Sequence, residues 1–101
     1  LDRNYDRIFV ETDQNTTLSG GSPGWIFVSI ADELLFVWCD SRKRLLRINH
    51  LDFKTFKPWF LDNQKKYYLH RCTEFDTEPE GRLVPVEDIP TEMIRRIDYR
   101  Y

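Results

Sequence analysis

The chain has 101 residues, of which 41% are hydrophobic, 15% aromatic and 32% charged, and its formal net charge is −2. This composition suits one small domain over residues 1–101, and it argues against intrinsic disorder and against a uniformly basic nucleic-acid coat. No apolar run approaches the length of a membrane span, and the opening LDRNYDRIFV has neither a signal-peptide nor a transit-peptide pattern. We therefore expect a cytoplasmic protein with no membrane partner.

In chain order, the first predicted element is a strand over Tyr5–Glu11, with Ile8 and Val10 on one face. The stretch Thr12–Ser22 has few large apolar residues and two adjacent glycines, which predicts a mobile loop. The apolar residues of Trp25–Ala31 recur at helical spacing, which predicts one or two helical turns.

A continuous apolar run, Leu34–Cys39, predicts a buried central strand in the densest part of the core. A Leu35→Ala change there should then cost on the order of 2 to 5 kcal/mol. The polar turn Asp40–Lys43 and the apolar Arg44–Ile48 complete a β-hairpin.

The second half begins with a predicted helix, because Phe53, Phe56 and Phe60 are spaced as one helical face. A start near Asp52–Thr55 and an end near Asn63 fit the capping signals and the position of a proline. A strand over Tyr67–Cys72 and an acidic loop up to Gly81 follow.

Two further elements are predicted before the C-terminus. Arg82–Val86 reads as a strand, and Pro85 favours an edge position for it. Pro90–Ile97 reads as a short helix with its proline in the first turn. The expected fold class is therefore α+β, with a small mixed or antiparallel sheet, a central hairpin and two or three short helices.

Charge is unevenly distributed along the chain. Residues 1–40 carry a net charge of −5, residues 41–71 carry +7, and residues 72–101 carry −4, which sum to −2. Basic side chains interleaved with aromatic ones suit a phosphate backbone and exposed bases. The alternative is that the aromatic side chains belong to the core and the lysines cover a solvated face. The basic block contains Arg42, Lys43, Arg44, Arg47, Lys54, Lys57, Lys65, Lys66 and Arg71.

Several segments together resemble a group of bacteriophage and bacterial nucleases. They are Ile8–Glu11, Gly24-Trp25, Ser29–Asp32, Leu34–Trp38, Leu45–Ile48 and Gly81–Ile89. In order and content these segments are similar to the later part of the PD-(D/E)XK, restriction endonuclease-like family. In this register the Pro-Asp and Glu-x-Lys elements of the family would precede residue 1, so the chain is expected to be a C-terminal portion or a degenerate relative.

This resemblance implies a restriction endonuclease-like fold and a DNA endonuclease activity in the complete family, with Mg²⁺ bound only where the catalytic part is present. It gives Glu11 and Asp13 as catalytic candidates at the end of the first strand, without a complete metal site in this chain. Together, the resemblance, the loop and the basic block give these candidates for DNA contact: Gln14, Ser22, Trp25, Arg42, Lys43, Arg44, Lys54 and Lys57.

Two functions are consistent with these patterns. One is an incomplete or degenerate DNA endonuclease, and the other is a non-catalytic bacterial or phage module that binds DNA or a protein, with a homodimer as a further alternative.

The cysteines Cys39 and Cys72 have no metal-site spacing and are expected to be buried free thiols. The histidines His50 and His70 stand apart from any catalytic spacing, which favours local capping or packing.

Overall fold

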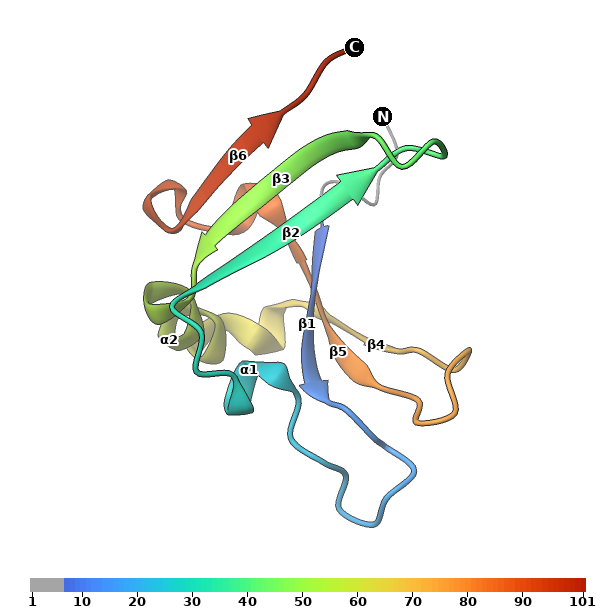
Figure 1. Cartoon of the computed structure of the whole chain (residues 1–101). Helices are drawn as coiled ribbons and strands as arrows, with labels where there is room; N and C mark the ends of the chain where they lie inside the picture. Colours follow the sequence, from blue (N-terminus) through green and yellow to red (C-terminus); the bar gives the residue numbers. More distant parts are fainter. Residues whose placement is uncertain (1–6) are drawn as a thin grey trace.

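Two antiparallel three-stranded sheets and one main helix make up this computed structural model, which describes residues 7–101 (Figure 1). The first sheet has the strand order β1-β5-β4 and the second has the order β2-β3-β6. The first sheet consists of β1 (Arg7–Asp13), β5 (Glu80–Pro85) and β4 (Tyr68–Arg71). The second consists of β2 (Glu33–Cys39), β3 (Leu45–Asp52) and β6 (Ile94–Asp98).

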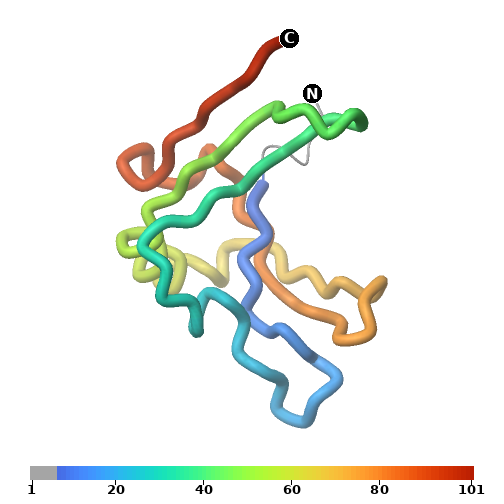
Figure 2. Tube along the Cα trace, in the orientation of Figure 1, coloured from blue at the N-terminus to red at the C-terminus, as the bar shows by residue number. Residues whose placement is uncertain are grey.

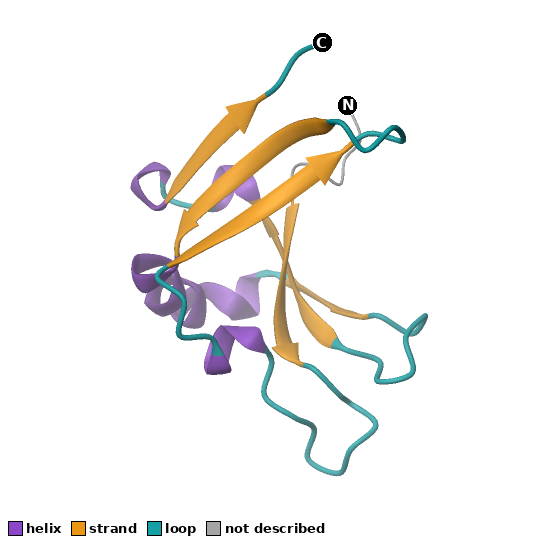
Figure 3. Ribbon diagram, in the orientation of Figure 1, coloured by secondary structure: helices purple, strands orange, loops and turns teal. Residues whose placement is uncertain are grey.

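The helical segments lie beside the sheets in Figure 3. Asp52 caps the main helix, because its Oδ1 accepts a hydrogen bond from the Lys54 N–H at 3.2 Å. The predicted boundaries of this helix are confirmed, although Pro58 lies in its interior rather than in its first turn. The segments are α1 (Trp25–Val28), α2 (Phe53–Asn63) and the 3₁₀ turns η2 (Gln64–Lys66), η3 (Val86–Asp88) and η4 (Thr91–Met93).

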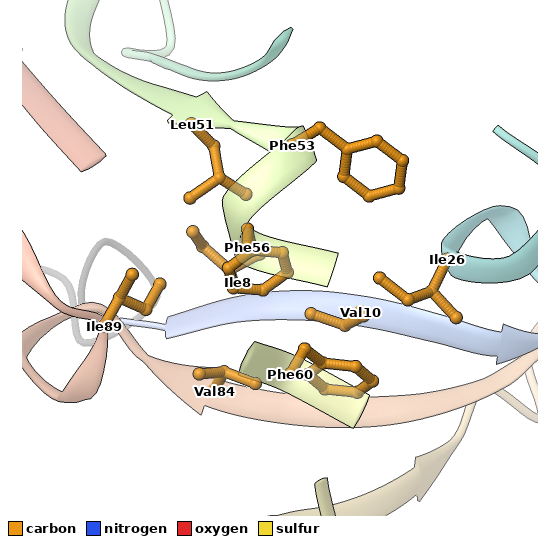
Figure 4. Close-up of a cluster of buried hydrophobic side chains, with 9 residues drawn as sticks. All are labelled: Ile8, Val10, Ile26, Leu51, Phe53, Phe56, Phe60, Val84 and Ile89. Atoms are coloured by element: carbon orange, nitrogen blue, oxygen red, sulfur yellow. The ribbon is translucent and has the colours of Figure 1, made fainter. Parts of the chain in front are cut away.

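The hydrophobic core lies where α2 meets both sheets (Figure 4). Phe56 and Phe60 are fully buried on the predicted face of α2, and their rings stack at a centroid distance of 5.9 Å. The first sheet contributes its inward-facing residues, including Ile8 and Val10, and burying each such side chain stabilises the fold by about 1.5–3 kcal/mol. The buried set is Ile8, Val10, Ile26, Leu51, Phe53, Phe56, Phe60, Val84 and Ile89.

The predicted hairpin is confirmed, but the prediction that Leu34–Cys39 is a buried central strand is wrong. β2 is an edge strand, and β3 is the central one. Burial alternates along β2, so Leu35 and Val37 are 60% and 52% exposed. The apolar run lacks polar breaks, yet only one of its faces meets the core, because no layer among the described residues covers the other.

Two predictions in the C-terminal part are also wrong. β5 lies between β1 and β4, so Pro85 does not mark an edge strand; it is tolerated as the last strand residue, opposite Arg7. The predicted helix Pro90–Ile97 is the single 3₁₀ turn η4 followed by β6. Ile94 and Ile97 have helical spacing, but each pairs with a residue of β3 and they lie on opposite faces of the sheet.

Smaller outcomes concern single side chains. Cys39 is exposed rather than buried, because it belongs to the outward-facing positions of β2, whereas Cys72 is half-buried. In the predicted helical turns only Ile26 enters the core, and Ile30 is 98% exposed. The start of the first predicted strand, Tyr5 and Asp6, lies outside the described residues. Among the helices of the described residues, none is long and apolar enough to cross a membrane.

Candidate functional site

The two catalytic candidates, Glu11 and Asp13, end β1 and hold the loop that follows it. Asp13 Oδ1 accepts hydrogen bonds from the N–H groups of Asn15 at 2.9 Å and Ser22 at 3.0 Å. Glu11 Oε1 accepts one from the Trp25 N–H at 3.3 Å. Both carboxylates therefore have a structural use, which is to fasten the loop and the start of α1 to the first sheet.

The loop itself closes through paired contacts and two close backbone approaches. The Gln14 side chain donates to Ser22 Oγ at 2.9 Å, and the Gln14 N–H donates to the Ser22 carbonyl at 2.9 Å. Gly21 has φ +71°, and a Cβ there would lie 2.1 Å from an oxygen of Asp13. A Cβ on Gly24 would lie 2.3 Å from the Glu11 carbonyl oxygen, so only glycine lets α1 cross β1 this closely.

The structure brings the candidates Glu11, Asp13, Gln14 and Ser22 together at one corner of the first sheet. Trp25 starts α1 beside them, but its ring packs against Phe36 and Phe53, at centroid distances of 6.2 Å each. Within residues 7–101, no group of three or more His, Cys, Asp or Glu side chains is arranged to hold a metal ion.

The predicted basic block does not form one surface. Lys54 and Lys57 both lie on α2. Lys54 pairs with Asp32 at 3.3 Å, and the Lys57 ammonium donates a hydrogen bond to the Phe27 carbonyl at 3.3 Å. Arg71 pairs with Glu80 at 3.0 Å on the first sheet. Of the aromatic residues in the same block, Phe53, Phe56 and Phe60 are core residues and Trp59 and Tyr67 pack against the core, as the alternative predicted, whereas Tyr68 is 69% exposed.

A different set of cations lies at one end of the second sheet, the end that has the β2–β3 turn and the last residues of β6 (Figure 2). Arg47 lies opposite Asp98 in the β-ladder, and the Tyr99 N–H donates to the Leu46 carbonyl at 2.9 Å. We call this region the basic tip. Its six cations and two carboxylates give a formal charge of +4. The charged members of the basic tip are Arg42, Lys43, Arg44, Arg47, Arg96 and Arg100, with Asp40 and Asp98.

Asp40 shapes the turn of the basic tip. Its Oδ1 accepts hydrogen bonds from the N–H groups of Arg42 and Arg44 at 2.9 Å each, and its Oδ2 accepts one from the Arg44 side chain at 2.8 Å. The backbone hydrogen bond from Arg44 is the largest of the effects that lower the Asp40 pKa. Lys43 completes the turn at φ +63° and donates its N–H to the Asp40 carbonyl.

The C-terminal side of the basic tip is held by Asp98 and Tyr101. The Asp98 carboxylate forms ion pairs with Arg47 at 2.7 Å and with Arg96 at 3.2 Å. The hydrogen bond from Arg47 is the main cause of the lowered pKa of Asp98. The Tyr101 hydroxyl donates to the Leu45 carbonyl at 2.8 Å, while the Arg44 guanidinium lies 4.7 Å from the ring centroid. Tyr101 nevertheless remains 73% exposed.

Three cations of the basic tip are available to a ligand. Arg42, Lys43 and Arg100 are exposed, and within the described residues none of them forms an ion pair. Sequence reasoning selected the first two but missed Arg100, Arg96 and Tyr101, because they belong to a stretch with net charge −4. Recognising the last segment as a strand paired with β3 would have placed them here.

The opposite end of the second sheet is acidic. A hollow of about 560 Å³ lies there, and His50 Nε2 pairs with Glu33 Oε2 at 2.9 Å beside it. The local role predicted for His50 therefore consists of a contact across the β2–β3 pair. The hollow is lined by Glu33, His50, Asp52, Thr91, Glu92, Met93, Ile94 and Arg95.

Comparison with known proteins adds no relative. No protein-family model, no curated protein and no solved structure matches this chain.

Proposed function

We propose that this chain is a non-catalytic module that binds nucleic acid through the basic tip. The observation that carries the proposal is the convergence of two segments far apart in the sequence. The β2–β3 turn supplies Arg42 and Lys43, and the C-terminal segment supplies Arg100 and the exposed ring of Tyr101. Together the two segments place cations that form no ion pair among the described residues beside an aromatic ring, and neither segment alone provides this combination.

The chemistry of the basic tip suits a polyanion. Each phosphate neutralised by a lysine or arginine releases condensed counterions, and this release drives sequence-independent binding. The Tyr101 ring offers a surface for a base, since base–aromatic stacking contributes about 1–3 kcal/mol per base and tolerates any sequence. The Arg44 guanidinium, which pairs with Asp40, lies over one face of this ring, so a base would stack on the other face.

The acidic regions lie elsewhere on the chain, and this supports an oriented approach of the ligand. Glu33 and Asp52 lie at the other end of the same sheet, and the acidic loop between β4 and β5 belongs to the first sheet. Because exposed charges separated by more than about 10 Å are largely screened at moderate salt, these carboxylates weaken binding at the basic tip only modestly.

A DNA endonuclease of the PD-(D/E)XK family, with its restriction endonuclease-like fold, is the second candidate. The observation that favours it is the pair Glu11 and Asp13 at the mouth of a loop with two glycines. The residues present do not fit a complete Mg²⁺ site, because within residues 7–101 no third His, Cys, Asp or Glu side chain joins Glu11 and Asp13 in an arrangement that could hold a metal ion. We therefore expect no plasmid nicking in Mg²⁺; nicking that disappears in Glu11→Gln would favour the nuclease.

The binding proposal is tested with two triple variants that reverse the same number of charges. Arg42→Glu, Lys43→Glu and Arg100→Glu change the basic tip, whereas Lys54→Glu, Lys65→Glu and Lys66→Glu change exposed lysines of α2 and η2. Arg44 is left intact because it holds Asp40.

Fluorescence anisotropy with a labelled oligonucleotide at low salt should show a loss of at least about tenfold in affinity for the tip variant, since it removes three phosphate contacts. The control variant should lose much less. Equal losses in both variants would mean that only the net charge matters, and an unbound native chain would remove the proposal altogether.

A further inference from the structure

The two edges of the second sheet differ in their protection. The β6 edge carries Arg95, Arg96 and Asp98, and such charges on an edge strand discourage pairing with another chain. The β2 edge has neither a charge nor a proline from Leu34 to Cys39. This second edge therefore has the composition of a strand that accepts a partner.

The backbone of β2 is oriented to accept one. The Phe53 N–H donates to the Asp32 carbonyl and the Asp40 N–H donates to the Arg44 carbonyl, both at 2.9 Å. Because hydrogen-bonded positions alternate in an antiparallel pair, the even-numbered residues of β2 bond to β3. Leu35 and Val37 consequently direct their N–H and C=O groups to the open edge. Within the described residues, β3 is the one strand that pairs with β2.

The charges that flank β2 indicate which partner fits. Asp32 and Glu33 stand at its start, and Arg42 and Lys43 follow its end. A second β2 running antiparallel brings the acidic start of each copy beside the basic end of the other. A register centred on Val37 pairs residues 35–39 of the two strands and brings Asp32 of each copy close to the turn that carries Arg42 of the other, whereas one centred on Phe36 brings Asp32 close to Asp40.

Side chains on the exposed face of β2 also come into contact in this arrangement. In the register centred on Val37, the two Val37 side chains become cross-strand neighbours, and Leu35 lies opposite Cys39. Val37 and Leu35 are 52% and 60% exposed in the single chain, so pairing removes apolar surface from water.

We propose that the chain forms a two-fold symmetric dimer in which β2 pairs antiparallel with β2 of a second copy. The two three-stranded sheets then form one continuous sheet, and each copy satisfies the open edge of the other. An isologous contact of this kind is closed, so it yields dimers rather than fibres.

Sedimentation of the native chain over a concentration series, without nucleic acid, tests this pairing separately from nucleic-acid binding. The native chain should convert from monomer to dimer as concentration rises. Val37→Lys should weaken the dimer by at least about tenfold, because like charges directly opposite each other destabilise a strand pair. The control Ile30→Lys adds the same charge at a residue that is 98% exposed outside the strands, and it should change dimerisation less than about twofold.

Amide hydrogen exchange of the native chain provides a second readout that needs no variant. The N–H groups of Leu35 and Val37 should exchange more slowly at high concentration, while the N–H of Arg96 on the β6 edge should not change. A native chain that stays monomeric at all concentrations overturns the proposal. A dimer that Val37→Lys and Ile30→Lys weaken equally, or that protects Arg96 and not Val37, overturns it as well.

Discussion

The two ends of the sheet β2-β3-β6 have opposite uses, although the same three strands build both. At one end, Leu34, Leu51 and Ile94 lie in register across the strands and pack on the core around α2. At the other end, the corresponding row is Trp38, Arg47 and Asp98. The row at the core end is entirely apolar, whereas the row at the basic tip contains the buried Arg47, whose charge is tolerated because Asp98 accepts its hydrogen bond.

The largest expected contrast is between two leucines of this sheet. Leu51 is fully buried in β3, so Leu51→Ala should lower the free energy of unfolding by about 2–5 kcal/mol through lost transfer energy and a cavity. Leu35 is 60% exposed on β2, and Leu35→Ala should cost less than about 1 kcal/mol. Denaturant unfolding of both variants measures the contrast, and equal losses would mean that β2 is buried as the apolar run first indicated.

Asn49 lies between the two ends and is fully buried on β3. Neither polar atom of its side chain has a hydrogen-bond partner in the described part of the chain. Because an unsatisfied buried polar group costs about 1–3 kcal/mol, Asn49→Leu should raise the free energy of unfolding by on the order of 1 kcal/mol. A clear loss of stability in the same denaturation experiment would instead reveal a role for this amide in binding or folding.

The acid sensitivity of the basic tip should be measurable through Asp98. Its folded-state pKa is lowered, chiefly by the hydrogen bond from Arg47, so its contribution to stability is present above the unfolded pKa of an aspartate. That contribution is lost as pH falls through the lowered pKa. The stability difference between the native chain and Asp98→Asn should therefore shrink between neutral pH and about pH 2. A difference that is constant with pH would assign Asp98 no electrostatic role.

The smallest expected effect concerns Lys43, whose φ of +63° is unfavourable for a residue with a Cβ. Lys43→Gly should raise the free energy of unfolding by a few tenths to about 1 kcal/mol, because glycine adopts this conformation without the steric cost. The same change should reduce the salt dependence of nucleic-acid binding by about one phosphate contact. Higher stability without weaker binding would place Lys43 outside the interface.

The sequence predicts best those elements whose signals are local. The helix α2 was placed correctly because the spacing of its phenylalanines and the cap at Asp52 both lie within the segment. Ile8 and Val10 were placed on one face of β1 by simple alternation, and both are buried. The hairpin was recognised because its polar turn directly joins two apolar runs.

Features that depend on distant pairing could not be read in this way. Whether β2 is a central or an edge strand depends on which other strands pair with it, and the composition of β2 does not indicate those partners. The segment after Pro90 has helical spacing, but pairing with β3 overrides this local preference. The basic tip was only half visible, since Arg100 and Tyr101 reach the β2–β3 turn through that same pairing.

The most direct test of the nucleic-acid proposal is the slope of log affinity against log salt for the native chain and for the triple reversal at Arg42, Lys43 and Arg100. Three phosphate contacts predict a slope of about −2 on single-stranded nucleic acid and about −3 on duplex DNA. The triple reversal should flatten that slope to near zero, whereas the reversal at Lys54, Lys65 and Lys66 should leave it unchanged. A native slope near zero, or a slope that the tip reversal does not alter, would contradict binding through the basic tip.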